Sequence, residues 1–282
     1  MRRPPLLFAS ALALAALLAP SAAAAYCRTT TDETFQPTAA VPCALDGAPL
    51  WWPLASVDFY LNQQASAQIS LADTRAAADT AFQHWTHAGC PTDLATCAGS
   101  GDGVPSITVR DAGDTAVHVA QYKGDGSDEN VILYWDSGWP YSDVDTTLAL
   151  TTVTFGADSG RIVDADIEIN SDPAHVLLTA GDPTKSVYDL PSILQHETGH
   201  FLGLAHSPLA DATMNAYYQR GSISMRTLSA DDVCGICNVY PPTVIAGGGC
   251  AMGGEAPTRA IAILSVGLCV LGVVRRRSRH SQ

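Results

Sequence analysis

Three histidines and one glutamate, close together near residue 200, have the types and spacing of a catalytic metal site. The segment reads His196-Glu197-Thr198-Gly199-His200-Phe201-Leu202-Gly203-Leu204-Ala205-His206. His196 and His200 are four positions apart, so on a helix both imidazoles leave the same face. Glu197 stands one position round the helix, where it lies beside a metal ion without binding it. Three histidine ligands leave the fourth tetrahedral position of zinc open, which is typical of catalytic zinc.

A sharp turn after the helix is the second requirement of this site. Gly203 tolerates the positive φ that such a turn needs, and the turn would carry His206 back as the third ligand. The short pattern His-Glu-x-x-His is a moderate signal, whereas the long form with the glycine and third histidine is specific. One helical histidine alone is usually a surface or core residue. The combination favours metal binding, with Glu197 as the general base.

The first 25 residues have the composition of a signal peptide. Arg2 and Arg3 precede an apolar run, and a stretch of small residues ends at Ala25. This pattern predicts export and cleavage before Tyr26. Residues 26–50 are then expected to form a disulfide-tied N-terminal segment.

Residues 246–282 are expected to form a targeting tail. Here a glycine run with Cys250 precedes an apolar stretch of 15 residues, 260–274, and a cluster of four arginines. A stable membrane span needs about 20 apolar residues, and the arginines would stay on the cytoplasmic side. A core helix is the alternative for this stretch.

The remaining residues are strongly acidic. Residues 26–245 hold eight Lys and Arg against 27 Asp and Glu, a formal charge of −19, while the whole chain carries −13. This balance argues against nucleic acid and anionic membrane surfaces as partners of the domain. We expect one monomeric domain with a sizeable core, in contact with a membrane only through the C-terminal tail.

Six cysteines in the same region predict disulfides, because their number is even and they follow a signal peptide. They are Cys27, Cys43, Cys90, Cys97, Cys234 and Cys237. We predict pairing between neighbours in the sequence: 27 with 43, 90 with 97, and 234 with 237. A redox or metal-binding role for the last pair is the alternative, although no second Cys-x-x-Cys completes a four-cysteine zinc site.

The hydrophobic pattern predicts an α+β fold with a mixed, twisted sheet, a metal-bearing helix and a small C-terminal helical part. A helix is expected over 70–88, a second one is capped by Asp189, and a last one begins at Ser229. Strands are expected over 57–61, 106–110, 131–135, 148–155 and 162–170. Asp164, Asp166 and Glu168 alternate along the last of these strands and share one face. Solvated charge is the simplest explanation of that face, and a calcium site with the loop 124–129 is the alternative.

With these features in place, the chain resembles the metzincin zinc endopeptidases, and most closely their matrixin branch. The histidine segment matches the matrixin form, including Gly199 and the serine after His206. Met214 then matches the methionine of the family's Met-turn, and Tyr218 matches a tyrosine that helps to wall the primed-side specificity pocket. The proline usual between these two residues is replaced by Ala216. The resemblance runs from about Pro53 to Tyr240 and implies a catalytic domain over 51–245.

The resemblance implies one catalytic zinc ion and hydrolysis of internal peptide bonds in a protein or peptide substrate. The family's structural-zinc loop is not recognisable, and His118 alone cannot replace it. The substrate strand would pair with an exposed sheet edge over residues 148–155. The tail over 246–282 is similar to the C-terminal sorting signals of myxobacteria, which implies a location at the cell envelope, at the surface or outside the cell. Two rival functions stay open: a zinc-binding surface protein without peptidase activity, and a zinc amidase acting on cell-wall peptides.

Overall fold

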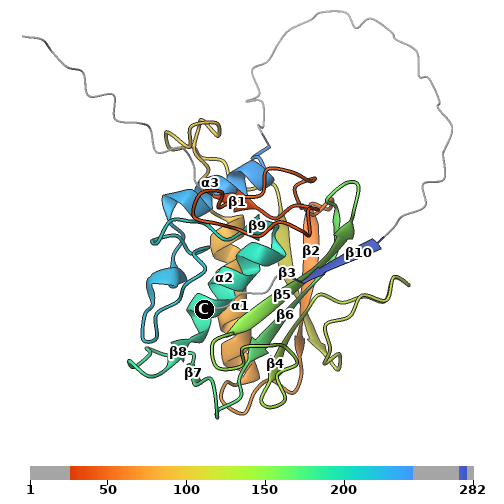
Figure 1. Cartoon of the computed structure of the whole chain (residues 1–282), viewed down its shortest axis with the longest axis vertical. Helices are drawn as coiled ribbons and strands as arrows, with labels where there is room; N and C mark the ends of the chain where they lie inside the picture. Colours follow the sequence, from red (N-terminus) through yellow and green to blue (C-terminus); the bar gives the residue numbers. More distant parts are fainter. Residues whose placement is uncertain (1–25, 244–272, 278–282) are drawn as a thin grey trace, which may run out of the picture.

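The computed structural model describes residues 26–243 and, for the backbone alone, residues 273–277. In this part of the chain a six-stranded twisted sheet has the strand order β10-β5-β6-β4-β2-β3 (Figure 1). Its strands are β2 (Ser56–Asn62), β3 (Thr108–Thr115), β4 (Val131–Trp135), β5 (Ala149–Gly156), β6 (Ile162–Asn170) and β10 (Val273–Arg277). The strands β3, β2, β4 and β6 are parallel, whereas β5 runs antiparallel to β6 and β10 antiparallel to β5. The predicted mixed sheet is confirmed.

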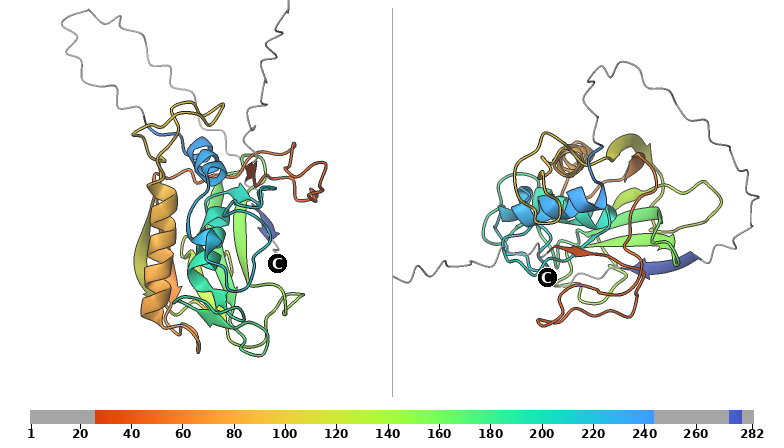
Figure 2. Two further views of the ribbon diagram at one scale, coloured as in Figure 1. Left: turned by 90° about the vertical axis from the view of Figure 1, so that its left-hand side faces the viewer. Right: turned by 90° about the horizontal axis from the view of Figure 1, so that it is seen from above.

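Two long helices lie side by side on one face of this sheet (Figure 2). They are α1 (Leu71–Thr86) and α2 (Leu190–Phe201), and α3 (Ala230–Val239) lies at one end of the molecule (Figure 1). Short pairs complete the described fold: β1 (Cys27–Arg28) with β9 (Leu204–Ala205), and β7 (Leu178–Thr179) with β8 (Tyr188–Asp189). A 3-10 turn, η1, spans Ser224–Arg226.

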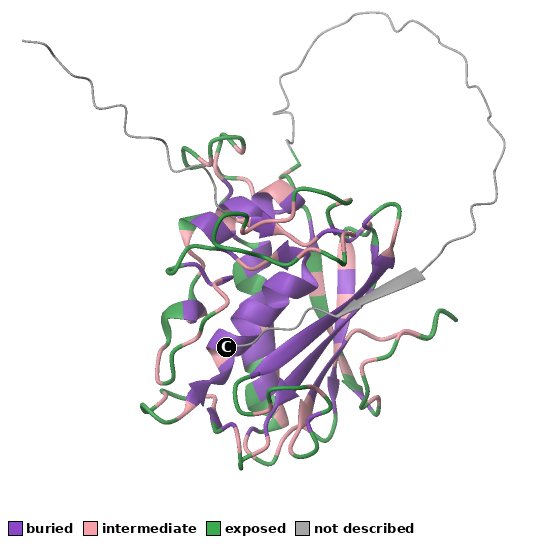
Figure 3. Ribbon diagram, viewed as in Figure 1, coloured by how far each residue is buried: buried purple, intermediate pink, exposed green. Residues whose placement is uncertain are grey.

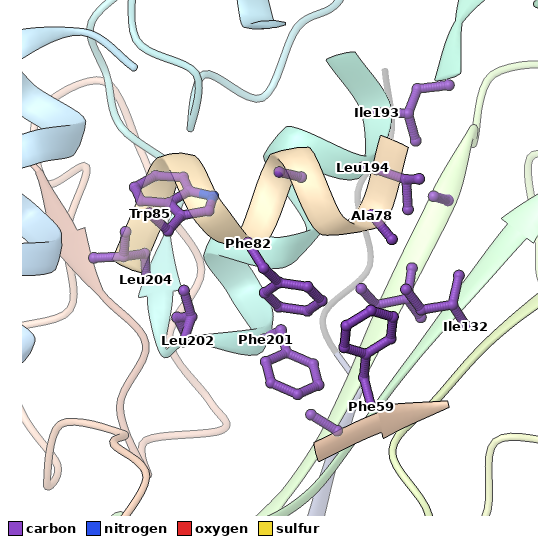
Figure 4. Packing of buried hydrophobic residues seen from close by; sticks show 14 of the residues in the cluster. Phe59, Ala78, Phe82, Trp85, Ile132, Ile193, Leu194, Phe201, Leu202 and Leu204 are labelled. Carbon is purple, nitrogen blue, oxygen red and sulfur yellow. The ribbon is translucent and has the colours of Figure 1, made fainter. Parts of the chain in front are cut away.

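Aromatic side chains from both helices and from β2 join the two layers (Figure 4). The ring of Phe82 on α1 lies 4.8 Å from Phe59 on β2 and 5.0 Å from Phe201 on α2, measured between ring centroids. All three are at most 2% exposed. The indole nitrogen of Trp52 donates to the carbonyl of Phe201 at 2.8 Å. This cluster fixes α2 against the sheet, because interiors are close-packed and resist displacement.

Side-chain caps set the first residues of the three helices, as the sequence predicts. The Ser70 side chain accepts from the backbone N–H of Asp73, and Asp189 accepts from that of Ser192. Ser229 and Asp232 form a capping box at the start of α3. These contacts satisfy donors that a helix leaves without internal partners.

The predicted strands agree closely with β2, β4, β5 and β6, whereas β3 starts two residues later and runs five residues further than the pattern indicates. Its second half reads Asp111-Ala112-Gly113-Asp114-Thr115, which lacks the alternation of a half-buried strand. β3 is an edge strand of the sheet, where charged residues are common. Asp111 and Asp114 both pair with Arg75 on α1, so contacts with the helix extend the strand.

The disulfide prediction is correct for one bridge and wrong for two. Cys27 pairs with Cys43, but Cys90 pairs with Cys237 and Cys97 with Cys234. Cys234 and Cys237 lie one turn apart on α3, so both side chains face the loop after α1 rather than each other. The two bridges therefore join α3 to the segment that follows α1. A redox or metal pair at these positions is excluded by the same finding.

The ends of the chain lie largely outside the described residues. Residues 1–25, the expected signal peptide, and residues 246–272 and 278–282 of the expected tail are outside the described part. The exception is β10, which pairs with β5 from Val273 opposite Gly156 to Arg277 opposite Thr152. Among the described residues, no helix has the length and apolar character needed to cross a membrane.

Candidate active site

The helix α2 places the first two histidines and the glutamate in the interior of the molecule. Nearly every residue of α2 is buried (Figure 3). At its N-terminus the carboxylate of Asp189, itself fully buried, accepts from Ser192 and forms an ion pair of 2.6 Å with Arg226. Both contacts hold the start of the helix, and the aromatic cluster holds its end.

Backbone carbonyls fix the orientation of the first two histidine rings. His196 Nδ1 donates to the carbonyl of Thr213 at 2.7 Å, and His200 Nδ1 donates to the carbonyl of Leu204 at 2.8 Å. With each proton on Nδ1, the Nε2 atoms carry the lone pairs that a metal requires. The two Nε2 atoms lie 3.1 Å apart, so both rings are directed at one point.

A turn at Gly203 brings His206 to the same point. The φ of Gly203 is +96°, and a Cβ there would lie 2.6 Å from the carbonyl oxygen of Leu50, so only glycine fits. The ring centroid of His206 lies 5.2 Å from that of His196 and 5.0 Å from that of His200. Ligand atoms of all three histidines come within 4.8 Å of one another.

The three rings fit a zinc ion in chemistry as well as in position. Burial lowers the pKa of His196 to about 4. Burial, together with the charge of His196, lowers the pKa of His206 to about 3. Both imidazoles are therefore neutral at physiological pH, which is the form that binds metal. Among the described residues, no other group of His, Cys, Asp and Glu side chains brings three ligand atoms this close.

Glu197 lies on the same helix and is 2% exposed. Its Oε2 accepts a hydrogen bond of 2.6 Å from the hydroxyl of Thr151 on β5. Burial raises the pKa of the Glu197 carboxyl to about 8, against the smaller opposing effect of the Thr151 hydrogen bond. A carboxylate whose pKa lies near neutrality can both take up and release a proton, as a general base must.

Met214 packs against α2, and hydrogen bonds of its backbone fix its position. Its N–H donates to Asp232 at 3.0 Å, and its carbonyl accepts from Ser207 at 2.8 Å. The sulfur is so close to α2 that a Cβ on Gly199 would meet it at 2.3 Å. The same Cβ would lie 2.8 Å from the ring of Trp85. Gly199 is therefore required by the packing beneath the site.

Three residues that support the site are not evident from the sequence: Thr151, Trp85 and Asp232. The indole N–H of Trp85 donates to the carbonyl of Gln195 at 2.9 Å and to Thr198 Oγ1 at 3.1 Å. Asp232 caps α3 and also accepts from the backbone of the methionine turn. Only its role as a cap leaves a local sequence signal. The other contacts join segments far apart in the chain.

Tyr218 contacts the residue that caps the start of α2. Its hydroxyl donates to the carbonyl of Ser222 and accepts from the backbone N–H of Asp189. Burial raises the pKa of Tyr218 to about 12. Its ring lies 5.8 Å from that of Tyr188. The residue thus links the loop after Met214 to the N-terminus of the metal-bearing helix.

The acidic row on β6 is buried, so the interpretation of this face as solvated charge is wrong. Asp164, Asp166 and Glu168 are at most 2% exposed. Asp166 accepts from the backbone of Val131, and Glu168 accepts from the indole N–H of Trp135. Burial and the neighbouring Asp164 raise the pKa of Asp166 well above its usual range.

Comparison with known proteins places this site in a family. A family model described as Matrixin matches residues 106–241, which include all three histidines. Matrix metalloproteinase-B of Caenorhabditis elegans is 50% identical over 46 residues, 16% of this chain and 9% of that protein. Metalloendoproteinase 4-MMP of Arabidopsis thaliana is 34% identical over 98 residues, 34% of this chain and 26% of that protein. Metalloendoproteinase 5-MMP of the same plant is 38% identical over 77 residues, 27% of this chain and 20% of that protein. The aligned part covers at most about a quarter of each relative.

Proposed function

Over residues 106–241 this chain belongs to the matrixin family of zinc metalloendopeptidases, and we propose that it hydrolyses internal peptide bonds of proteins outside the cytoplasm. The observation that carries this proposal is the convergence of three histidines beside a buried glutamate of raised pKa. A metal-binding protein without peptidase activity has no need of the glutamate, since Glu197 is not among the three ligands.

In this proposal His196, His200 and His206 hold the zinc ion through their Nε2 atoms. When bound, zinc supplies Lewis-acid chemistry, the activation of water and the polarisation of a carbonyl group. Glu197 accepts the proton of the attacking water and passes it to the leaving amine. Met214 supports the helix from beneath and touches no substrate.

The substrate strand is proposed to pair with the outer edge of β5 in place of β10, which covers this edge in the structure, so the expectation of an exposed edge is not met. The strand runs past the site, since Thr151 on β5 contacts Glu197 directly. Its outer edge accepts an antiparallel strand, as the pairing with β10 demonstrates. Main-chain pairing of this kind gives affinity with little demand on substrate sequence. Tyr218 is proposed to wall a primed-side pocket from the far end of α2.

Export is proposed from the first 25 residues and from the three disulfides, which persist in oxidising compartments. The tail over 246–282 is proposed to hold the protein at the cell envelope. The domain acts as a monomer in this proposal.

A cleavage profile on a mixed peptide library tests the proposed activity. The library contains unstructured peptides and cell-wall peptides, and products are identified by mass spectrometry before chelation, after chelation and after zinc is restored. We expect cleavage at internal bonds, loss on chelation and recovery with zinc. Cleavage confined to cell-wall peptides would show an amidase instead, and no cleavage with zinc bound would contradict the proposal.

A further inference from the structure

Thr151 is the one polar residue in a row that is otherwise apolar. Alternate residues of β5 face the helices: Ala149, Thr151, Val153 and Phe155. The first, third and fourth belong to the hydrophobic core, and Thr151 is 0% exposed among them. Burying a hydroxyl has a free-energy cost unless it is hydrogen-bonded. Packing alone therefore does not account for a threonine at this position.

The hydroxyl of Thr151 forms its hydrogen bonds with Glu197, the proposed general base. Thr151 Oγ1 donates to Glu197 Oε2 at 2.6 Å and lies 3.2 Å from the backbone carbonyl of the same residue. Both contacts cross from the sheet to α2, between residues 46 positions apart in the chain. The neighbouring Thr152 marks the last position of the β10 pairing, opposite Arg277. One strand thus presents its outer edge to a paired segment and its inner face to Glu197.

We propose that Thr151 is a positioning residue that holds the Glu197 carboxylate in the orientation needed for proton transfer. This inference rests on the proposed peptidase function. The hydrogen bond from a hydroxyl fixed on β5 restrains where the acceptor oxygen can lie, because hydrogen bonds weaken steeply away from their preferred geometry. Because Oε2 accepts from Thr151, the proton taken from water is received by the other oxygen, Oε1. That proton then moves to the leaving amine, while the threonine hydroxyl neither gains nor loses one.

The same hydrogen bond links substrate docking to the base. A peptide on the edge of β5 would pair with the strand that carries Thr151, so the distance from the peptide to Glu197 is set through the strand. Placement of reacting groups within a fraction of an ångström controls rate far more than it controls binding. The expected effect of losing the hydroxyl is therefore on kcat and not on KM.

The test compares Thr151→Val, which removes the hydroxyl at nearly constant volume, with Thr151→Ser, which keeps it. We expect the valine variant to lose about tenfold in kcat, less than the ~10²–10⁴-fold worth of a whole general base. KM and zinc content should stay within about twofold of the wild type, and serine should restore most of kcat. Thr86→Val is the matched control, since Thr86 is also buried and donates to a carbonyl, that of Phe82 on α1. It should lower stability without lowering kcat.

Crystal structures of the zinc-loaded wild type and Thr151→Val give a readout that does not depend on activity. We expect the Glu197 carboxylate to rotate away from its wild-type position in the valine variant while the three histidines stay in place. An unmoved carboxylate, or an equal loss of kcat in the serine variant, would overturn the proposal. Should the wild type cleave no peptide at all, the proposed function fails, and the carboxylate position alone decides the role of Thr151.

Discussion

Burial decides the chemistry of the individual residues at this site. The spacing of His196, His200 and His206 could be recognised in the sequence, because a helix and one glycine turn bring such residues together by local geometry alone. The contacts of Thr151 and Trp85 could not, since they depend on β5 and α1 lying against α2. The ionisation properties of Glu197 also follow from tertiary burial, which no local pattern reveals.

The raised pKa of Glu197 predicts how the metal-free protein responds to pH. The folded-state pKa of about 8 lies above the usual glutamate value of 4.5. Between these values the folded state holds a proton that the unfolded state has lost, so stability falls as pH rises through this window. Glu197→Gln has no such proton to lose. Its Tm advantage over the wild type, measured without metal, should grow from about pH 5 to about pH 8 and then level off.

A Tm difference that is constant across this range would show that burial does not perturb Glu197. Thr86→Val, measured in the same buffers, controls for a general loss of stability with pH.

The contact of Gly199 with the methionine turn predicts the effect of one added methyl group. A Cβ at position 199 would meet the sulfur of Met214 at 2.3 Å and the ring of Trp85 at 2.8 Å. Overpacking of this kind costs about 1–3 kcal/mol. Gly199→Ala should lower the free energy of unfolding by that amount, measured by urea denaturation. Gly89→Ala is the control, because nothing lies within 4 Å of the Cβ it would add. Equal effects of the two substitutions would show that the space beneath α2 is not tight.

At the scale of elements, features that depend on residues within one helical turn can be predicted from the sequence. Features that depend on a residue far away in the chain cannot. The caps at Ser70, Asp189 and Ser229 are visible in the sequence because each acts within one turn of its own helix. The pairing of Cys90 with Cys237 and of Cys97 with Cys234 is not visible in the sequence, because it depends on where α3 lies. The far half of β3 is missed for the same reason, since Arg75 on α1 pairs with its acidic residues.

The two bridges between α3 and the loop after α1 predict a non-additive effect. Each closes a long loop, of 147 or 137 residues, but either alone keeps α3 attached. Replacing one cysteine pair with alanines should lower the free energy of unfolding by about 3 kcal/mol. With the other bridge intact, the lost bridge had closed only a short loop of about ten residues, made of the segments 90–97 and 234–237. Replacing both pairs also opens the long loop between α1 and α3 and should lower the free energy of unfolding by about 8 kcal/mol in total. Urea denaturation of the three variants measures this, and a double loss equal to the sum of the single losses would contradict the nested arrangement.

At the scale of the whole molecule, the described residues form a mixed sheet with α1 and α2 on one face and α3 at one end (Figure 1). The sequence predicts this class correctly, since the order and spacing of the strands and helices are visible in the hydrophobic pattern. It does not predict that residues 273–277 pair with β5. Val273 and Val274 belong both to this strand and to the apolar stretch 260–274 of the expected tail.

Deletion of residues 247–282 should therefore change two properties at once. The domain should stay folded and be released from the cell envelope. Its KM for peptides should fall, because β10 no longer competes for the edge of β5. A synthetic peptide covering 270–282 should raise the KM of the truncated protein again, whereas the same peptide with proline at 274 and 276 should not. Loss of folding on deletion, or an unchanged KM together with no effect of the peptide, would contradict this prediction.

Metal content and activity, measured on the same samples, separate the proposed zinc-binding role of the three histidines from the proposed proton transfer by Glu197. Zinc content and the rate of peptide cleavage are determined for the wild type, Glu197→Gln and His206→Ala. We expect Glu197→Gln to keep stoichiometric zinc and lose at least ~10²-fold in kcat, since only proton transfer is removed. His206→Ala should lose the metal, because two histidines bind zinc weakly. Full cleavage by zinc-loaded Glu197→Gln, or unchanged zinc in His206→Ala, would contradict the account.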